Sequence, residues 1–148
     1  MNIKINENDI LECFPTRVLG NTIDISSQDS YIHILNEDKN IPLSTSLESK
    51  IKDIEVSNKI FFIEAIILQP PNTMEINTKS GETVSVTDTI IGDDTGETRL
   101  VAWRDLSNRL KGFNIGERVK IKAAFATTNK EGKTELTLKP YSSIIKIS

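Results

Sequence analysis

The sequence IIGDDTGETRLVAWRD, at residues 90–105, joins two β-rich runs through a dense polar turn. The turn at 92–96 contains two glycines, which allow positive φ angles, and two aspartates, which cap backbone N–H groups. The run after the turn ends in the only tryptophan of the chain, Trp103, and Arg104 follows it directly. This pattern predicts a hairpin whose second strand ends in an aromatic ring next to a cation.

Side chains alternate between the two faces of a strand, so Arg99 and Trp103 share one face of this second strand. Leu100 and Ala102 lie on the opposite face and suit the interior of a small barrel. A charged side chain such as Arg99 does not suit that interior, so we expect Trp103 to lie outside beside Arg99. The alternative is that Trp103 closes one end of the barrel as part of its core.

Further β-rich runs lie on both sides of this hairpin, separated by turn signals rich in Gly, Pro and Asn. One segment has a helical period, because Leu106 and Leu110 are four residues apart. Asp105 is a favourable N-cap for this helix, and Gly112 suits the C′ position. The strands are expected at residues 60–68, 75–79, 84–91, 97–103, 117–127, 134–138 and 143–147.

This order predicts an all-β fold. Three barrel strands, one short helix and two further barrel strands form the sequence of elements of a five-stranded OB-fold barrel, with the helix between strands 3 and 4. A generic β-sandwich requires no such helix and has more strands. We therefore predict an OB-fold domain at residues 51–148 and a β-rich N-terminal extension with a linker at residues 1–50.

The N-terminal extension contains three further candidate strands, at residues 10–18, 21–26 and 30–35, before a polar linker at 36–49. The pattern GNTIDI followed by YIHI resembles the pattern GKTELTL followed by IIKI near the end of the chain. Two interpretations remain open. The extension is either a β-rich segment that packs on the barrel or the last strands of a preceding, incomplete OB domain.

Composition limits the function. No run of the 148 residues approaches eighteen apolar positions, and no secretory signal is visible, so a cytoplasmic protein without a membrane span is expected. The formal net charge is −3, which by itself argues against a generic nucleic-acid binder. The charge is uneven, however. Residues 1–58 hold five basic and ten acidic residues, whereas residues 59–148 hold 13 basic and 11 acidic residues.

The sequence lacks the residue types and motifs that several common classes of enzyme require. The chain has one cysteine, Cys13, and one histidine, His33, which argues against disulfides, Cys- or His-based metal sites and Ser-His or Cys-His catalysis. No Gly-x-x-x-x-Gly-Lys phosphate loop is present. We expect a non-enzymatic protein without a cofactor or metal. A divalent cation at Asp93 and Asp94 is the alternative to a solvated turn.

Several motifs together resemble the OB domains of the archaeal replication protein A and single-stranded DNA-binding protein family. These are IKDI at 51–54, TKSG at 78–81, GDDTGE at 92–97 with Leu100-x-x-Trp103, and FNIGERVKI at 113–121. The resemblance covers about two thirds of the chain, and Ala102 departs from it, since a bulky aliphatic residue usually precedes the Trp. It implies binding of single-stranded DNA in replication, repair and recombination.

On this resemblance and on strand parity, stacking is expected on Trp103, with Phe62 and Phe125 as further platforms. Phe62 shares a face with Glu64. Phe125 has core parity unless a bulge intervenes, whereas the resemblance implies an outward base-stacking aromatic there. Tyr141 is expected to pack against the barrel. Phosphates are expected to meet the barrel cations Arg99, Arg104, Lys120 and Lys122, and the hairpin-tip lysines Lys79 and Lys133.

Two other functions remain open. An OB barrel also serves as a protein-contact or oligomerisation module, in which case the acidic segment 1–58 would recruit a partner such as another replication or repair protein. RNA binding by the same face is the third alternative, since no motif distinguishes ribose from deoxyribose.

Overall fold

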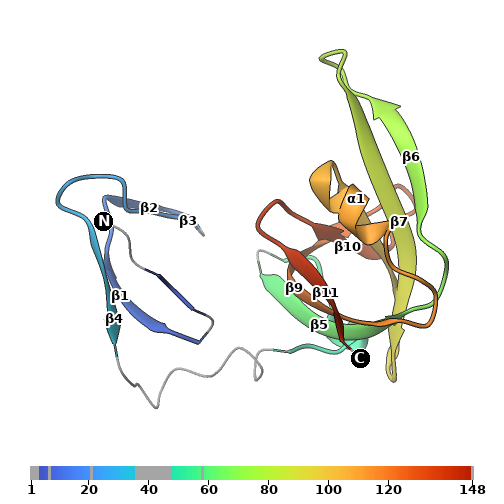
Figure 1. Ribbon diagram of the computed structural model, residues 1–148, viewed down its shortest axis with the longest axis horizontal. Coiled ribbons are helices and arrows are strands. Elements are labelled where there is room, and N and C mark those ends of the chain that lie inside the picture. The colour runs from blue at the N-terminus through green and yellow to red at the C-terminus, as the bar shows by residue number, and fades with distance from the viewer. Residues whose placement is uncertain (1–3, 7, 21, 36–47, 58, 148) are drawn as a thin grey trace. The chain divides into compact units, whose positions relative to one another are not determined.

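The computed structural model describes residues 4–6, 8–20, 22–35, 48–57 and 59–147 (Figure 1). The chain divides into two compact units, residues 1–47 and residues 48–148. The second unit contains the strands and the helix around Trp103.

Five strands of the second unit close into a barrel. Strand β5 (Ile60–Ile67) pairs antiparallel with both β7 (Thr83–Asp93) and β9 (Arg118–Thr128). Strand β8 (Gly96–Trp103) pairs antiparallel with β7 and parallel with β10 (Thr134–Leu138). The antiparallel pairing of β9 with β10 completes the circle, and β11 (Ser143–Ile147) adds to the free part of β9. A single helix, α1 (Asp105–Leu110), lies between β8 and β9 in the sequence. This is an OB fold, and the predicted fold class is confirmed.

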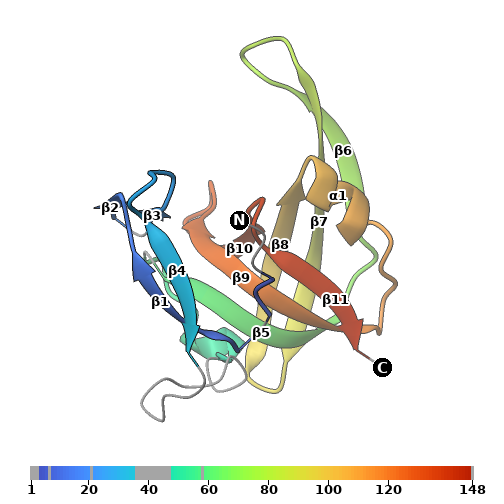
Figure 2. The same ribbon diagram turned by 60° about the vertical axis from the view of Figure 1, so that its left-hand side comes forward.

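A long hairpin extends the barrel wall. Strand β6 (Asn72–Asn77) pairs with the first half of β7, and the two strands project beyond the barrel on the side of α1 (Figures 1 and 2). Pro70 and Pro71 separate β5 from β6, because proline has no N–H to donate to a strand ladder. The strand begins at Asn72, three residues earlier than the sequence predicted.

The interior of the barrel is filled by aliphatic side chains that alternate with outward residues along each strand. Side chains with no exposed surface come from every barrel strand; they include Ile63, Ile91, Leu100, Ile121 and Leu136. At about 1.5–3 kcal/mol for each fully buried Leu or Ile side chain, this cluster is the main source of the stability of the domain.

Helix α1 closes one end of the barrel. Leu110 is fully buried in the core, and the buried hydroxyl of Ser107 lies 2.7 Å from the hydroxyl of Thr87 on β7. The predicted N-cap was wrong by one residue: Arg104 is the N-cap, with φ 58° and no side-chain cap bond, and Asp105 is the first helical residue. The turn from β8 into α1 imposes this left-handed backbone and overrides the capping preference of Asp105.

The described part of the first unit contains two small antiparallel sheets. One pairs β1 (Ile10–Phe14) with β4 (Tyr31–Leu35), and the other pairs β2 (Arg17–Leu19) with β3 (Thr22–Asp24). The strand predicted over 10–18 is therefore interrupted after Phe14, where Pro15 cannot donate a ladder hydrogen bond. The predicted linker falls mostly on residues 36–47, outside the described residues. Across the described ranges, the model contains no helix with the length and apolar character needed to cross a membrane.

Candidate functional site

Trp103 lies on the outer surface at the end of β8. Its side chain is 41% exposed, whereas Leu100 and Ala102 on the same strand are completely buried, so the predicted facing of this strand is confirmed. The strand register places Val86 of β7 opposite Trp103, and Met74 of β6 opposite Val86. The indole is therefore the end of an apolar row that crosses three strands.

A cleft of about 430 Å³ lies beside Trp103, between the end of β8, the start of α1 and the end of β10. Leu106 and Leu138 supply apolar walls, and Arg104 and Lys139 supply cations. Arg104 is fixed at the cleft in two ways. Its backbone N–H donates to the Ser85 carbonyl at 2.8 Å, and its guanidinium donates to the Glu82 carboxylate at 2.7 Å. This second bond raises the pKa of Arg104 and lowers that of Glu82.

Phe125 lies outside the core because β9 contains a bulge. Ala123 has φ 60°, and the pairing of β9 with β5 gains one residue between Ile121 and Ala124. The extra residue reverses the facing of the strand beyond it, so Ala124 and Ala126 are buried while Phe125 is half-buried on the outward side. The facing expected from simple alternation was therefore wrong, and the bulge considered as its exception is present.

Lys139 connects the two aromatic rings. Its Nζ lies 5.7 Å from the centroid of the Phe125 ring, within the range of a cation–π contact, and the same side chain lines the cleft beside Trp103. Sequence reasoning missed this lysine, since a single Lys after a strand resembles any solubilising residue. The expected packing of Tyr141 against the barrel was also wrong, because its side chain is 62% exposed in the turn after Pro140.

Arg99 lies on the outward face of β8, as predicted, but two carboxylates hold it. Its Nε donates to Asp88 of β7 at 2.9 Å, and its Nη1 donates to Glu135 of β10 at 2.8 Å. The hydrogen bond that Arg99 donates to Asp88, and then the one that it donates to Glu135, raise the pKa of Arg99. The three side chains carry a combined charge of −1, so this part of the face offers no net positive charge to a phosphate.

Other predicted residues lie on a different part of the barrel wall. Phe62 is half-buried on the outward face of β5, next to Glu64 in the alternation. Lys120 lies 3.2 Å from the Glu48 carboxylate, and Lys122 is half-buried opposite Ser143 of β11. These residues belong to the β5–β9–β11 part of the wall, whereas Trp103, Arg99 and Arg104 belong to the β7–β8–β10 part.

The two hairpin-tip lysines lie at opposite ends of β8. Lys79 is exposed in the turn between β6 and β7, on the hairpin that contacts Arg104 through Glu82. Lys133, in the turn between β9 and β10, lines a cleft of about 480 Å³ together with Arg99, and its Nζ lies 3.5 Å from Glu131. The face that runs from Arg99 to Trp103 is therefore bordered by a loop at each end.

The GDDTG turn has a structural role. The Asp93 carboxylate accepts hydrogen bonds from the Thr95 and Gly96 N–H groups of the turn, and from the Ile51 N–H of a short 3-10 helix (Ile51–Asp53) before β5. Asp94 pairs with Lys50 at 2.8 Å. The turn thus fastens the start of the domain to the barrel. Among the described residues, no group of three or more His, Cys, Asp or Glu side chains is placed to hold a metal ion.

No protein-family model and no curated protein matches the sequence. Solved structures do match. A replication factor A-related protein from Methanobacterium thermoautotrophicum is 25% identical with a TM-score of 0.58, over 68% of this chain and 90% of its own. The second OB-fold domain of replication protein A from Methanococcus maripaludis is 21% identical with a TM-score of 0.53, over 68% of this chain and 97% of its own.

A third match is a chain of a replication protein A heterotrimer bound to single-stranded DNA. It is 16% identical with a TM-score of 0.59, and the match covers 68% of this chain and 24% of that chain. At this identity, the likeness concerns the fold alone. Residues 48–148 therefore form an OB-fold domain of the kind found in archaeal replication protein A-related proteins, which confirms the family resemblance of the sequence.

Proposed function

We propose that the OB domain binds single-stranded DNA on its β7–β8–β10 face, in the manner of a replication protein A domain, and takes part in replication, repair and recombination. The observation that carries this proposal is the exposed Trp103 ring beside a cleft that also contains Arg104 and Lys139. The heterotrimer with a similar fold, bound to single-stranded DNA, supports the choice of ligand.

The geometry suits one base on the indole and phosphates beside it. Base–aromatic stacking contributes roughly 1–3 kcal/mol per base and requires only a flat exposed ring. Arg104 and Lys139 flank the ring at the cleft, where a sugar–phosphate backbone would pass. Phe125, under Lys139 and opposite Thr137 of β10, is the second platform. The proposed role is binding without chemistry.

The site favours single strands over duplex. A stacked, paired base has no free face for Trp103, and opening a duplex to expose one costs unstacking and unpairing energy. A duplex binder would instead need a strongly positive face for its phosphates. Here the Arg99 cluster is net negative, and Arg104 is paired with Glu82.

The test is the affinity of the full chain for a labelled oligothymidine, measured by fluorescence anisotropy for the wild type and for Trp103→Ala. We expect the variant to bind more weakly by ~1–3 kcal/mol while its circular dichroism spectrum stays that of the wild type. An oligouridine and a duplex of equal length measure the preference for DNA over RNA and for single strands. Equal affinities of the wild type and the variant would contradict the proposal.

One observation favours a second candidate function. Carboxylates hold Arg99 from both sides, and an exposed Trp next to paired charges also suits a protein-contact surface. Salt separates the two functions, because nucleic-acid binding weakens with a log–log slope of about −0.7 for each phosphate contact on a single strand. Weak binding of the oligothymidine with a slope near zero would favour the protein-contact function.

A further inference from the structure

The N-terminal unit has an apolar surface that its described residues do not cover. None of its described residues is buried, although the strands are rich in aliphatic side chains. Leu11, Val18, Ile23 and Ile34 are 37%, 58%, 56% and 43% exposed. Two-stranded sheets are marginally stable alone, so a surface of this kind requires a partner.

The strand register of the N-terminal unit indicates what kind of partner would cover this apolar surface. Strands β1 and β4 form five antiparallel pairs, from Ile10↔Leu35 to Phe14↔Tyr31. Strands β9 and β11 of the barrel also form five antiparallel pairs, from Arg118↔Ile147 to Lys122↔Ser143. Each residue of β1 thus corresponds to the residue of β9 that lies 108 positions later, as Ile10 does to Arg118.

The correspondence continues beyond the first sheet. After Phe14 the chain turns at Pro15 and pairs as β2 with β3; after Lys122 the chain turns at the Ala123 bulge and pairs with β10. The same shift of 108 relates Pro15 to Ala123. The order and direction of pairing are therefore those of β9, β10 and β11.

The same correspondence holds for the faces on which the side chains lie. Leu11 and Val18 correspond to Val119 and Ala126, which are 0% and 1% exposed in the barrel core. Ile23 pairs with Val18, and Leu136 pairs with Ala126, so Ile23 corresponds to Leu136. Leu136 is also fully buried in the barrel. The polar pair Glu12 and His33 lies on the opposite face of the first sheet.

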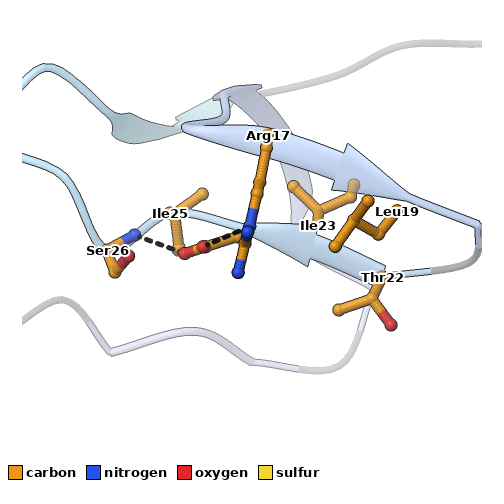
Figure 3. A pocket seen from close by; sticks show the side chains of 7 residues that line it. Arg17, Leu19, Thr22, Ile23, Ile25 and Ser26 are labelled. Carbon is orange, nitrogen blue, oxygen red and sulfur yellow. Dashed lines mark hydrogen bonds and ion pairs between the residues drawn. The ribbon is translucent and has the colours of Figure 1, made fainter.

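A shallow cleft of about 440 Å³ lies on the β2–β3 hairpin (Figure 3). Leu19, Ile23 and Ile25 supply its apolar lining, next to the ion pair of Arg17 with Asp24 at 3.2 Å. Ile25, directly after β3, corresponds to Leu138, the last residue of β10. Leu138 is only 2% exposed in the barrel. In the barrel, β5, β7 and β8 cover the equivalent positions.

We infer that the apolar face of the N-terminal unit binds a three-stranded antiparallel β-sheet with one apolar face, equivalent to β5, β7 and β8, and so completes a second OB-type barrel. By the register of the existing barrel, the partner sheet adds an antiparallel strand to the free edge of β1 and a parallel strand to β3. Leu11, Val18, Ile23 and Ile25 then become core residues.

The test supplies such a sheet to the chain. A second copy of residues 48–116 is joined directly to Asp9 of the full chain, since Asp9 corresponds to Glu117, and every residue from Asp9 onward is kept. Amide hydrogen exchange of β1–β4 is compared with that of the unextended chain. We expect exchange in β1–β4 to slow by about 100-fold or more, because these amides then open only with the whole barrel.

Two exposed residues provide the matched variants in the extended chain. Val18→Asp puts a charge on the proposed inner face and should abolish the slowing, whereas His33→Asp, on the opposite face with Glu12, should preserve it. No slowing in the extended chain would overturn the inference, and so would equal behaviour of the two variants. Slow exchange of β1–β4 in the unextended chain would also overturn it, since the face would then already be covered.

Discussion

Nη1 of Arg99 on β8 lies 2.8 Å from Oε2 of Glu135 on β10, and the two residues are 36 positions apart in the sequence. The Glu135 side chain is only 12% exposed, so this pair is less screened by solvent than a surface ion pair. Asp88 holds the same guanidinium from the other side. A phosphate that approaches Arg99 therefore competes with two carboxylates that are already in place.

This competition predicts that Glu135→Gln strengthens the binding of single-stranded DNA. The variant keeps the shape of the side chain but removes its charge, which leaves Arg99 with one carboxylate and raises the local charge from −1 to zero. We expect a several-fold higher affinity and a log–log salt slope steeper by up to about 0.7, the value for one added phosphate contact. Anisotropy titrations at several salt concentrations measure both quantities.

Glu55→Gln is the matched control, since Glu55 is an exposed carboxylate in the segment before β5 and its loss changes the net charge equally. An equal gain in the control would show a general charge effect. Weaker binding by Glu135→Gln would contradict competition between the carboxylate and the phosphate, because it would mean that the carboxylate assists the ligand.

The β9 bulge predicts an unusual effect of glycine. Ala123 has φ 60°, a left-handed conformation that costs a residue with a Cβ roughly 1–2 kcal/mol. Ala123→Gly should therefore raise the free energy of unfolding by about 0.5–1 kcal/mol, since part of the gain is offset by the greater freedom of Gly in the unfolded chain. Ala124→Gly, at the buried neighbour, should lower it. Urea denaturation of the two variants checks the opposite signs, and destabilisation by both would argue against the left-handed bulge.

The Asp93 turn predicts a dependence of stability on pH. Burial, the largest single effect, raises the pKa of Asp93, but hydrogen bonds from Thr95, Ile51 and Gly96 together outweigh it, so the pKa lies below its ordinary value of 3.8. A carboxyl of this kind stabilises the fold at pH above its unfolded pKa. That contribution is lost as the pH falls through the folded pKa.

We expect Asp93→Asn to lower the free energy of unfolding at pH 7 by about 1–2 kcal/mol, because the Ile51 N–H loses a charged acceptor. The difference from the wild type should start to shrink as the pH falls below about 4, where the carboxyl of the unfolded chain becomes protonated, and should be lost as the pH falls through the lower folded pKa. Denaturant unfolding between these pH values measures it. Asp94→Asn, next to it on the exposed side of the turn, should have little effect. A constant difference at every pH would be evidence against an ionised Asp93.

Much of the barrel could be predicted from the sequence because its strands are marked locally. Alternation between Leu100 and Arg99 fixed the facing of β8, and strands β10 and β11 have the predicted bounds. Residue preference did not locate the N-cap at Arg104 or the bulge at Ala123, since neither Arg nor Ala favours positive φ; a bulge before Phe125 was considered only as an exception to its core parity. Those conformations are imposed by the closure of the barrel around them.

The candidate site was harder to predict because its contacts are non-local. The outward position of Trp103 followed from strand parity, but the carboxylates around Arg99 come from two other strands. Lys139 reaches Phe125 only because the bulge turns that ring outward. The likeness of β3 and β4 to β10 and β11 was visible in the sequence as a faint repeat, and the strand register extended the correspondence to β1 and β9.

The fluorescence of Trp103, the only tryptophan of the chain, measures base stacking on this ring most directly. Trp103 is excited while an oligothymidine of about 15–20 nucleotides, longer than a typical OB-fold site, is added at low salt. We expect strong quenching of the emission by the single strand, reversal of the quenching by added salt, and no quenching by a duplex of equal length. Unchanged Trp103 emission under conditions in which anisotropy shows the oligomer bound would contradict stacking on this ring.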